Sequence, residues 1–203
     1  MLYGKPYNPQ EPVICFDEKS KELREDTRDG IPATEHTPRK RDYEYKRNGT
    51  TNIFLAVEPK GGSREVTATK RRTKRDFAKE MQRIANLPRY RAARQIHVVL
   101  DNLNTHFAPS FYETFTRGEA SRLLSRLRFH YTPKHASWLN MAEIELSILS
   151  RQALQGRIPT IENLQARIRR WKRERNKKRA MIQWRFTKRD ARKVFRYKDG
   201  KLS

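Results

Sequence analysis

Short apolar segments, separated by polar ones, run along the first two thirds of the chain and predict β-strands. Three of them hold a continuous apolar run, which is typical of strands covered on both faces; they are residues 13–16, residues 53–57, and residues 96–100 with the run Val98-Val99-Leu100. Shorter or alternating segments predict three further strands, at residues 43–46, 65–69 and 129–131. The polar residues 20–41 predict a long loop, and Asn48-Gly49 predicts a hairpin turn.

Apolar residues at helical spacing predict helices between the later strands. Residues 74–87 carry one apolar face, and Thr73 with Asp76 resembles a capping box at the start of that helix. Further helices are expected at residues 108–115, 119–127 and 138–153, the last capped by Ser137, and from Thr160 onward. Three strands followed by alternating helices and strands predict an α/β fold, in which helices pack against a mixed sheet.

Acidic residues follow two of the predicted buried strands. Asp17 ends the first strand and Asp101 ends a later one, and strand ends are where open α/β sheets place ligand sites. A turn or helix-capping aspartate is the alternative interpretation. The helix that follows the last strand brings a third carboxylate, but periodicity does not decide whether Glu143 or Glu145 points toward the strand ends.

Three carboxylates gathered at one edge of a sheet would raise one another's pKa, and a divalent cation removes that cost. Mg²⁺ prefers oxygen ligands and keeps coordination positions for water and phosphate oxygens. Two such ions about 4 Å apart can activate an attacking hydroxyl and stabilise the leaving oxygen in phosphoryl transfer. The acidic pattern therefore favours metal-dependent chemistry on a phosphodiester.

The composition adds a large positive charge. The 203 residues carry a formal net charge of +23, with a pI of about 10.6, which indicates a polyanionic partner such as nucleic acid. The single cysteine, Cys15, excludes an internal disulfide framework and a cysteine-based zinc site. No membrane-spanning apolar run and no secretion signal is evident, so we expect no membrane partner and a cytoplasmic, nucleoid-associated bacterial protein.

The last 50 residues hold much of this charge. Residues 154–203 contain 18 Lys or Arg and 4 Asp or Glu, a surplus of +14. Such a run is either a solvated helix face or a tract that lies along phosphates. In the second interpretation Trp171, Trp184 and Phe186 hold the tract to the domain.

Three longer motifs follow one another along the chain. They are Cys15-Phe16-Asp17-Glu18-Lys19, Leu100-Asp101-Asn102-Leu103-Asn104-Thr105-His106, and the run from Tyr131-Thr132-Pro133 to Leu139-Asn140-Met141-Ala142-Glu143. Together they resemble the catalytic domain of bacterial insertion-sequence transposases of the mariner-like superfamily, and most of all the insertion sequence 630 family.

The resemblance implies a ribonuclease H-like (retroviral integrase-like) fold, with a mixed five-stranded sheet flanked by helices and an Asp-Asp-Glu metal triad. By motif, Asp17 would be the first ligand, Asp101 the second, bridging two Mg²⁺ or Mn²⁺ ions, and Glu143 the third. The implied activity is metal-dependent cleavage of DNA followed by strand transfer in transposition. The implied partners are the transposon ends, the target DNA and a second copy in a homodimer.

Three parts are expected along the chain: an irregular lead-in at residues 1–11, the catalytic domain at residues 12–155, and a basic helical extension at residues 156–203 packed on it. The helix-turn-helix domain with which such transposases normally begin is expected to be absent, since the first catalytic strand starts near residue 13. The alternative to an enzyme is therefore a truncated, non-catalytic, basic DNA-binding remnant.

Residues around the triad complete the prediction. Asn102 and Asn104 are expected to orient Asp101 as supporting groups. His106 is interpreted first as a structural or capping residue and second as a contact to DNA or water, and Glu18 is expected to be exposed. The predicted DNA contacts are basic residues near a helix start, in the loop before Glu143 and on the last long helix: Lys70, Arg71, Arg72, Lys74, Arg75, Lys134, His135, Arg169, Arg170 and Arg173.

Overall fold

The computed structural model describes residues 2–38, 40–133 and 136–195, and a mixed five-stranded sheet forms its centre. The strands are β1 (Val13–Asp26), β2 (Tyr45–Glu58), β3 (Ser63–Thr69), β4 (Ile96–Leu100) and β5 (Leu127–Tyr131). Their order across the sheet is β3-β2-β1-β4-β5. The strands β1, β2 and β3 pair antiparallel, while β4 runs parallel to β1 and β5 parallel to β4. The predicted mixed sheet is confirmed.

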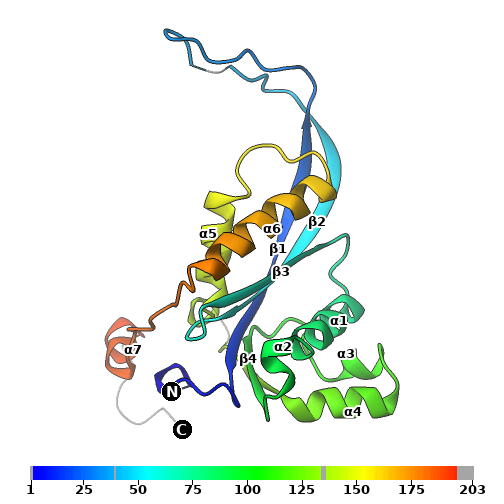
Figure 1. Ribbon diagram of the computed structural model, residues 1–203, viewed down its shortest axis with the longest axis vertical. Coiled ribbons are helices and arrows are strands. Elements are labelled where there is room, and N and C mark those ends of the chain that lie inside the picture. The colour runs from blue at the N-terminus through cyan, green and yellow to red at the C-terminus, as the bar shows by residue number, and fades with distance from the viewer. Residues whose placement is uncertain (1, 39, 134–135, 196–203) are drawn as a thin grey trace.

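Alternate residues of β1 are buried against two different layers of helices (Figure 1). Ile14 and Phe16 belong to a core with α1 (Lys74–Ala85), α2 (Pro88–Arg91), α3 (Pro109–Tyr112) and α4 (Arg117–Arg126). Cys15, between them, belongs to a second core with α5 (Ala142–Gln152) and α6 (Ile161–Lys177). Because side chains alternate with a period of two along a strand, this parity decides which layer each later residue of β1 meets.

The hairpin of β1 and β2 projects well beyond the rest of the domain (Figure 1). Both strands are 14 residues long, so the loop predicted at residues 20–41 is wrong over residues 20–26, which are strand. The polar composition of this part reflects its exposure rather than a lack of regular structure, because a projecting two-stranded ribbon has little core to face.

Asn48-Gly49 lies inside β2 and not in a hairpin turn, so that prediction is wrong. The pairing with β1 shifts its register between Glu22 and Arg24, opposite this dipeptide, and Gly49 has a φ of 94°. A bulge with glycine in the left-handed region demands the same residue as a tight turn. The sequence signal is therefore shared by the two structures.

Arg157, in the loop between α5 and α6, fastens the hairpin to the domain. Its guanidinium donates hydrogen bonds to Asp26 Oδ1 (2.6 Å) and to the carbonyl oxygens of Asp42 (2.7 Å), Tyr43 (3.0 Å) and Glu44 (2.7 Å). These acceptors lie at the end of β1 and just before β2. One side chain thus holds both sides of the hairpin.

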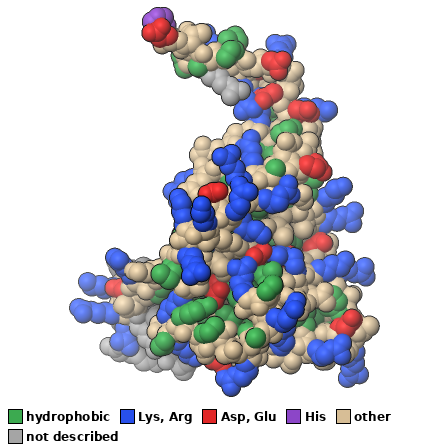
Figure 2. All heavy atoms as spheres, in the orientation of Figure 1, with side chains coloured by type: hydrophobic (Ala, Val, Ile, Leu, Met, Phe, Trp, Pro, Cys, Tyr) green, Lys and Arg blue, Asp and Glu red, His purple; other side chains and the backbone are tan. Residues whose placement is uncertain are grey.

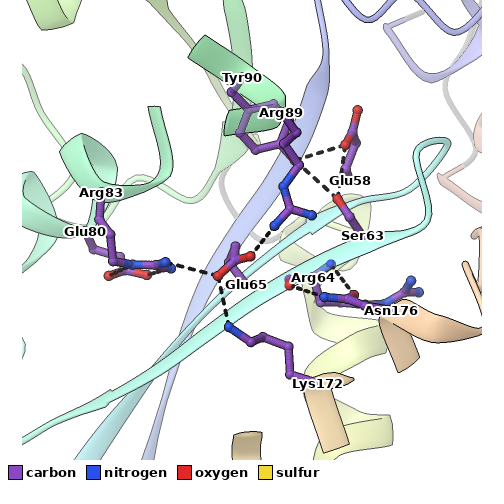
Figure 3. Close-up of polar contacts among 10 residues, drawn as sticks. All are labelled: Glu58, Ser63, Arg64, Glu65, Glu80, Arg83, Arg89, Tyr90, Lys172 and Asn176. Carbon is purple, nitrogen blue, oxygen red and sulfur yellow. Dashed lines mark hydrogen bonds and ion pairs between the residues drawn. The ribbon is translucent and has the colours of Figure 1, made fainter. Parts of the chain in front are cut away.

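Glu65 closes the outer edge of the sheet on β3 (Figure 3). Its carboxylate pairs with Arg83 of α1 (3.0 Å), with Arg89 of α2 and with Lys172 of α6 (3.2 Å). Burial raises the pKa of Glu65, but Lys172, Arg83 and Arg89 together bring it below its ordinary value. Helices from both layers are thereby joined across the edge strand.

The other predicted helices are present with shifted ends. The capping box of Thr73 and Asp76 starts α1 as predicted. The helix expected at residues 138–153 is shorter, since α5 begins only at Ala142 and a separate 3₁₀ turn, η2 (Ser137–Leu139), precedes it. Ser137 is therefore not the residue before that helix.

The basic C-terminal part packs on the domain through aromatic side chains. Trp171 of α6 is buried against the sheet. Farther along, Trp184 lies 5.2 Å from Tyr3 and 6.3 Å from Trp138 between ring centroids, and Phe186 contacts Trp138 edge-on at 4.8 Å. A short helix, α7 (Lys188–Phe195), follows, and a 3₁₀ turn, η1 (Leu2–Gly4), opens the described chain.

Lysine and arginine side chains are scattered over the whole face seen in Figure 2, with fewer acidic ones among them. Across the part of the chain that the structure describes, no helix combines the length and apolar character needed to cross a membrane.

Candidate active site

Strand parity brings Asp17 to the layer of α5. Asp17 follows Cys15 by two residues, and the next residue of the same parity, Lys19, donates a hydrogen bond to Ser150 of α5 (3.0 Å). On the neighbouring parallel strand Val99 pairs with Cys15 and lies in the same core, and Asp101 follows it by two residues. Asp17 thus leaves β1 toward α5, and Asp101 comes directly after the end of β4, the strand beside it.

Glu143 lies in the first turn of α5, and a buried asparagine fixes that turn against β1. The Asn140 side chain donates to the carbonyl oxygen of Phe16 (2.7 Å) and accepts from the N–H of Ala142 (3.1 Å). It therefore ties the start of α5 to the residue immediately before Asp17. Sequence reasoning gave Asn140 no role, although an asparagine just before a helix is a common signal of a helix start.

Glu145 has a different role from Glu143. Its side chain is fully buried and pairs with Arg64 of β3 (2.6 Å), itself fully buried, and with Arg175 of α6 (2.7 Å). Glu143, by contrast, is exposed and near enough to Asp17 to affect its ionisation. The structure separates the two residues: Glu145 joins α5 to β3 and α6, whereas Glu143 is exposed in the first turn of the helix and its charge acts on Asp17.

The three carboxylates interact electrostatically. Burial, and after it the charges of Glu143 and Asp101, raises the pKa of Asp17 to about 7. Burial also raises the pKa of Asp101, but the hydrogen bond and charge of His106 outweigh burial and bring it below its ordinary value. A buried carboxyl group surrounded by like charges is the electrostatic condition that a cation would relieve.

His106 is the partner of Asp101 that the structure reveals. Its Nδ1 lies 2.8 Å from Asp101 Oδ1, and its ring is fully buried beside Phe77 (4.6 Å between centroids). Its Nε2 lies 3.9 Å from Glu18 Oε2. The side chain of Glu18 is only 5% exposed and pairs with Arg72 (3.0 Å), so the prediction of an exposed Glu18 is wrong.

The two asparagines predicted to orient Asp101 have other surroundings. Asn102 donates its hydrogen bond to the carbonyl oxygen of Thr132 (3.1 Å), which joins the ends of β4 and β5. Asn104 is exposed. The hydrogen bonds that Asp101 Oδ1 accepts come from His106 and, at 3.4 Å, from the N–H of Leu103.

The donor set suits a hard divalent cation. Three carboxylates provide only oxygen ligands, as Mg²⁺ and Mn²⁺ prefer, and burial, together with the charges of Glu143 and Asp101, raises the pKa of Asp17. As the side chains stand in the described residues, no three of type His, Cys, Asp or Glu are close enough together to hold a metal ion. Because Glu143 is exposed, its side chain has room to turn toward the aspartates.

The predicted DNA contacts occupy two exposed places. All five basic residues from Lys70 to Arg75, which run from the loop after β3 into the first turn of α1, are exposed. Arg72 reaches the candidate site through Glu18. Arg169, Arg170 and Arg173 lie on the outer face of α6, opposite its buried stripe. Lys134 and His135 lie outside the described residues.

Comparison with known proteins gives a family match. Residues 12–165 match a family model described as DDE superfamily endonuclease. Among curated proteins, no match was found.

Solved structures of similar fold include three of Mos1. They are a transposase paired-end complex with the left transposon end (14% identity, TM-score 0.53), a mariner paired-end complex with Mn (14%, 0.53) and a pre-cleavage transpososome (13%, 0.52). Each alignment covers 84% of this chain and 55%, 52% and 55% of the other, respectively. The chain therefore spans about half the length of these relatives, with which it shares the fold.

Proposed function

This chain belongs to the DDE superfamily endonucleases, and from that premise we propose that it is a transposase catalytic domain that cuts DNA and joins the cut end to target DNA. The observation that carries the proposal is the placement of Asp17 on β1, Asp101 directly after the neighbouring parallel strand β4 and Glu143 in the first turn of α5, close enough for the charges of Asp101 and Glu143 to act on Asp17. The motifs favour the insertion sequence 630 group, with transposon ends as substrate, a homodimer as the working form and the bacterial nucleoid as its place of action.

In this proposal Asp17, Asp101 and Glu143 would hold two Mg²⁺ or Mn²⁺ ions. When bound, such ions lower the pKa of an attacking hydroxyl and stabilise the leaving oxygen. Asp17 lies within β1 and not at its end as the sequence predicted, Asp101 follows the end of β4, and Glu143 lies in the first turn of α5. These three elements are anchored in the core, which suits a site that must keep its geometry.

The reaction consumes only water and DNA, and the 3′-hydroxyl that hydrolysis leaves is the nucleophile of the second step. Water attacks a backbone phosphorus, the bond from phosphorus to the 3′ oxygen breaks, and a 3′-hydroxyl and a 5′-phosphate remain. The 3′-hydroxyl then attacks a target phosphorus, and the target's own 3′ oxygen leaves. The segment from Lys70 to Arg75 would hold the backbone beside the carboxylates, since Arg72 already reaches Glu18, the residue after Asp17.

Plasmid nicking tests the proposal. With Mg²⁺ or Mn²⁺ the wild-type chain should nick supercoiled DNA, and EDTA should stop it. Asp101→Asn should lower nicking by at least about 100-fold, because a metal ligand is lost, and should leave DNA binding in gel-shift assays unchanged. Asp29→Asn, which removes one exposed carboxylate on the projecting hairpin, is the matched control and should nick like wild type.

Two results would contradict it. Undiminished nicking by Asp101→Asn would exclude Asp101 as a ligand. Binding of DNA without any metal-dependent nicking by the wild-type chain would favour the non-catalytic remnant instead.

A further inference from the structure

His106 is a polar side chain in an apolar place. Its ring is 0% exposed and lies among Phe77 and Phe16, with 4.6 Å and 5.8 Å between ring centroids. A phenylalanine or leucine would fill such a position without the cost of a buried polar group. The Nδ1 atom lies 2.8 Å from Asp101 Oδ1 and 3.4 Å from the carbonyl oxygen of the same residue. The Nε2 atom has no hydrogen-bond partner in the described structure, and Glu18 Oε2 lies 3.9 Å from it.

A buried polar atom without a partner costs roughly 1–3 kcal/mol. In His106 this cost arises at Nε2, while Nδ1 contacts Asp101. The polar character of residue 106 is therefore used at Asp101, and packing alone does not account for it.

The imidazole cannot easily turn away from Asp101. Its own backbone is held on both sides, because the His106 N–H donates to Leu103 O (2.9 Å) and Tyr131 donates its hydroxyl hydrogen to His106 O (2.7 Å). On the far side of the ring stands Glu18, held by Arg72 at 3.0 Å. The hydrogen bonds of the His106 backbone N–H and carbonyl oxygen, together with Glu18 beside the ring, thus keep Nδ1 facing Asp101.

The consequence for Asp101 is a fixed carboxylate. Asp101 follows the end of β4, in a segment without regular structure, where a side chain would otherwise take several rotamers. The bond to His106 occupies Oδ1, and no hydrogen bond engages Oδ2 in the described part of the chain. One oxygen is held and the other remains available.

We infer that His106 is a positioning residue, which holds Asp101 in the orientation needed to bind a divalent cation. This rests on the proposed function, because it assumes that Asp101 is a metal ligand. His106 itself touches neither DNA nor the ion in this arrangement. Residues that orient metal ligands in this way typically change metal affinity by about 10- to 100-fold when they are replaced.

Two substitutions separate the hydrogen bond from the packing. In His106→Asn the amide nitrogen takes the place of Nδ1 and can still donate to Asp101, but the side chain is smaller. In His106→Leu the apolar volume is largely kept and the donor is lost. The affinity for Mn²⁺ alone, measured by isothermal titration calorimetry on the full chain, should fall about 10- to 100-fold in His106→Leu and stay within about threefold of wild type in His106→Asn.

Thermal melting without metal gives a second, opposite order. His106→Leu should melt at or above the temperature of His106→Asn, because the smaller asparagine leaves a cavity among the aromatic rings. A merely structural histidine would give metal affinity and melting temperature the same order. His97→Asn, which alters a buried histidine bonded to His130 (2.9 Å), is the control and should bind Mn²⁺ like wild type.

Asp101→Asn, titrated in parallel, tells the two possible failures apart. If it loses Mn²⁺ binding while His106→Leu binds as wild type does, the role of His106 is wrong and the proposed function stands. If wild type shows no Mn²⁺ binding that depends on Asp101, both are wrong. Should His106→Leu not fold, His106→Gln replaces it, since its amide lies where Nε2 was and cannot reach Asp101.

Discussion

Asp17 and Asp101 belong to the same candidate site, but the pKa of Asp17 is raised above the ordinary value of an aspartate and that of Asp101 is lowered below it. Asp17 is buried, and burial together with the charges of Glu143 and Asp101 raises its pKa to about 7. Asp101 is only partly buried and has His106 beside it, which keeps its pKa below the ordinary value. In the metal-free protein the ionised form of Asp17 is therefore disfavoured, whereas the ionised form of Asp101 is favoured.

Asp17→Asn should stabilise the metal-free protein at high pH. The folded state holds the proton of Asp17 up to a pH of about 7, whereas the unfolded state releases it near its ordinary value of 3.8, so wild-type stability falls between these values as pH rises. Asparagine carries no such proton. The gain in unfolding free energy should be small at pH 4 and reach its maximum above pH 7, where it is on the order of a few kcal/mol. Melting temperatures measured across this pH range should follow the same course.

Asp26→Asn is the control of opposite sign. The hydrogen bond from Arg41, with help from Arg157, lowers the pKa of Asp26 to about 2. The stability that this carboxylate contributes is present above its unfolded value of 3.8 and is lost as the pH falls toward 2. Asp26→Asn should therefore melt below wild type at pH 8. An Asp17→Asn protein that melts below wild type at pH 8 would contradict the electrostatic account.

The choice between Glu143 and Glu145 shows the limit of sequence reasoning at the scale of residues. The two lie two positions apart on one helix, and both flank its apolar stripe. What separates them is Arg64, which is 81 residues earlier in sequence and fully buried. No local pattern around Glu145 contains that partner. The resemblance favours Glu143 because it follows the Leu-Asn-x-x pattern directly, whereas Glu145 does not.

At the scale of elements, the strands that carry the aspartates were predictable, and the hairpin was not. Continuous apolar runs locate the buried parts of β1, β2 and β4, because burial on both faces requires them. The outer parts of β1 and β2 are polar because they face solvent, and their pairing with each other gives no signal in the composition of either strand. Asn48-Gly49 was then assigned to the more common structure.

Alanine should have opposite effects at Gly49, in the bulge of β2, and at Gly118, in α4. Gly49→Ala should destabilise the protein by about 1 kcal/mol, because Gly49 has a φ of 94°, a conformation that costs residues with a Cβ atom. Gly118→Ala should stabilise it by roughly 0.5–1 kcal/mol, since Gly118 lies in α4 and a Cβ there would meet only Arg122 at an ordinary 3.8 Å. Urea denaturation measures both.

The sign of the difference is the test. Gly49→Ala would also destabilise a true hairpin turn at residues 48–49, so this substitution does not distinguish a turn from a bulge. Hydrogen exchange makes that distinction. Amides of β1 and β2 on both sides of Gly49 should be protected in wild type, as expected for paired strands. Fast exchange throughout residues 20–26 would restore the loop interpretation.

At the scale of the whole molecule, the charge of +23 was the clearest signal in the sequence, but it does not say which cations meet DNA. Many of them are engaged within the fold: Arg83, Arg89 and Lys172 pair with Glu65, and Arg64 and Arg175 pair with Glu145. Arg71 and Arg75 form no ion pair within the described residues and stand beside Arg72, which reaches the candidate site.

Removing Arg71 and Arg75 together should therefore change the salt dependence of DNA binding. Each phosphate contact contributes about one unit to the slope of log K against log salt, so the double alanine variant should have a slope shallower by about 2. Fluorescence anisotropy with a labelled duplex at several salt concentrations measures it.

The matched control removes Arg91 and Arg128, which are exposed at the opposite end of the sheet, before β4 and at the start of β5. The net charge changes by the same amount in both variants. If the control shows an equal loss of slope, the cations act as a diffuse field and the segment from Lys70 to Arg75 has no special place in binding.

Because side chains alternate along β1, the loss of a single residue there would shift every later side chain of the strand to the other face of the sheet. Deleting one codon between Val13 and Phe16 would turn Asp17 over to the side of α1 or force the apolar residues to exchange layers. Most of the helices, the clamp at Glu65 and the cationic exterior would persist. Under the proposed function, a single small deletion in β1 would therefore abolish cleavage while leaving the basic surface in place.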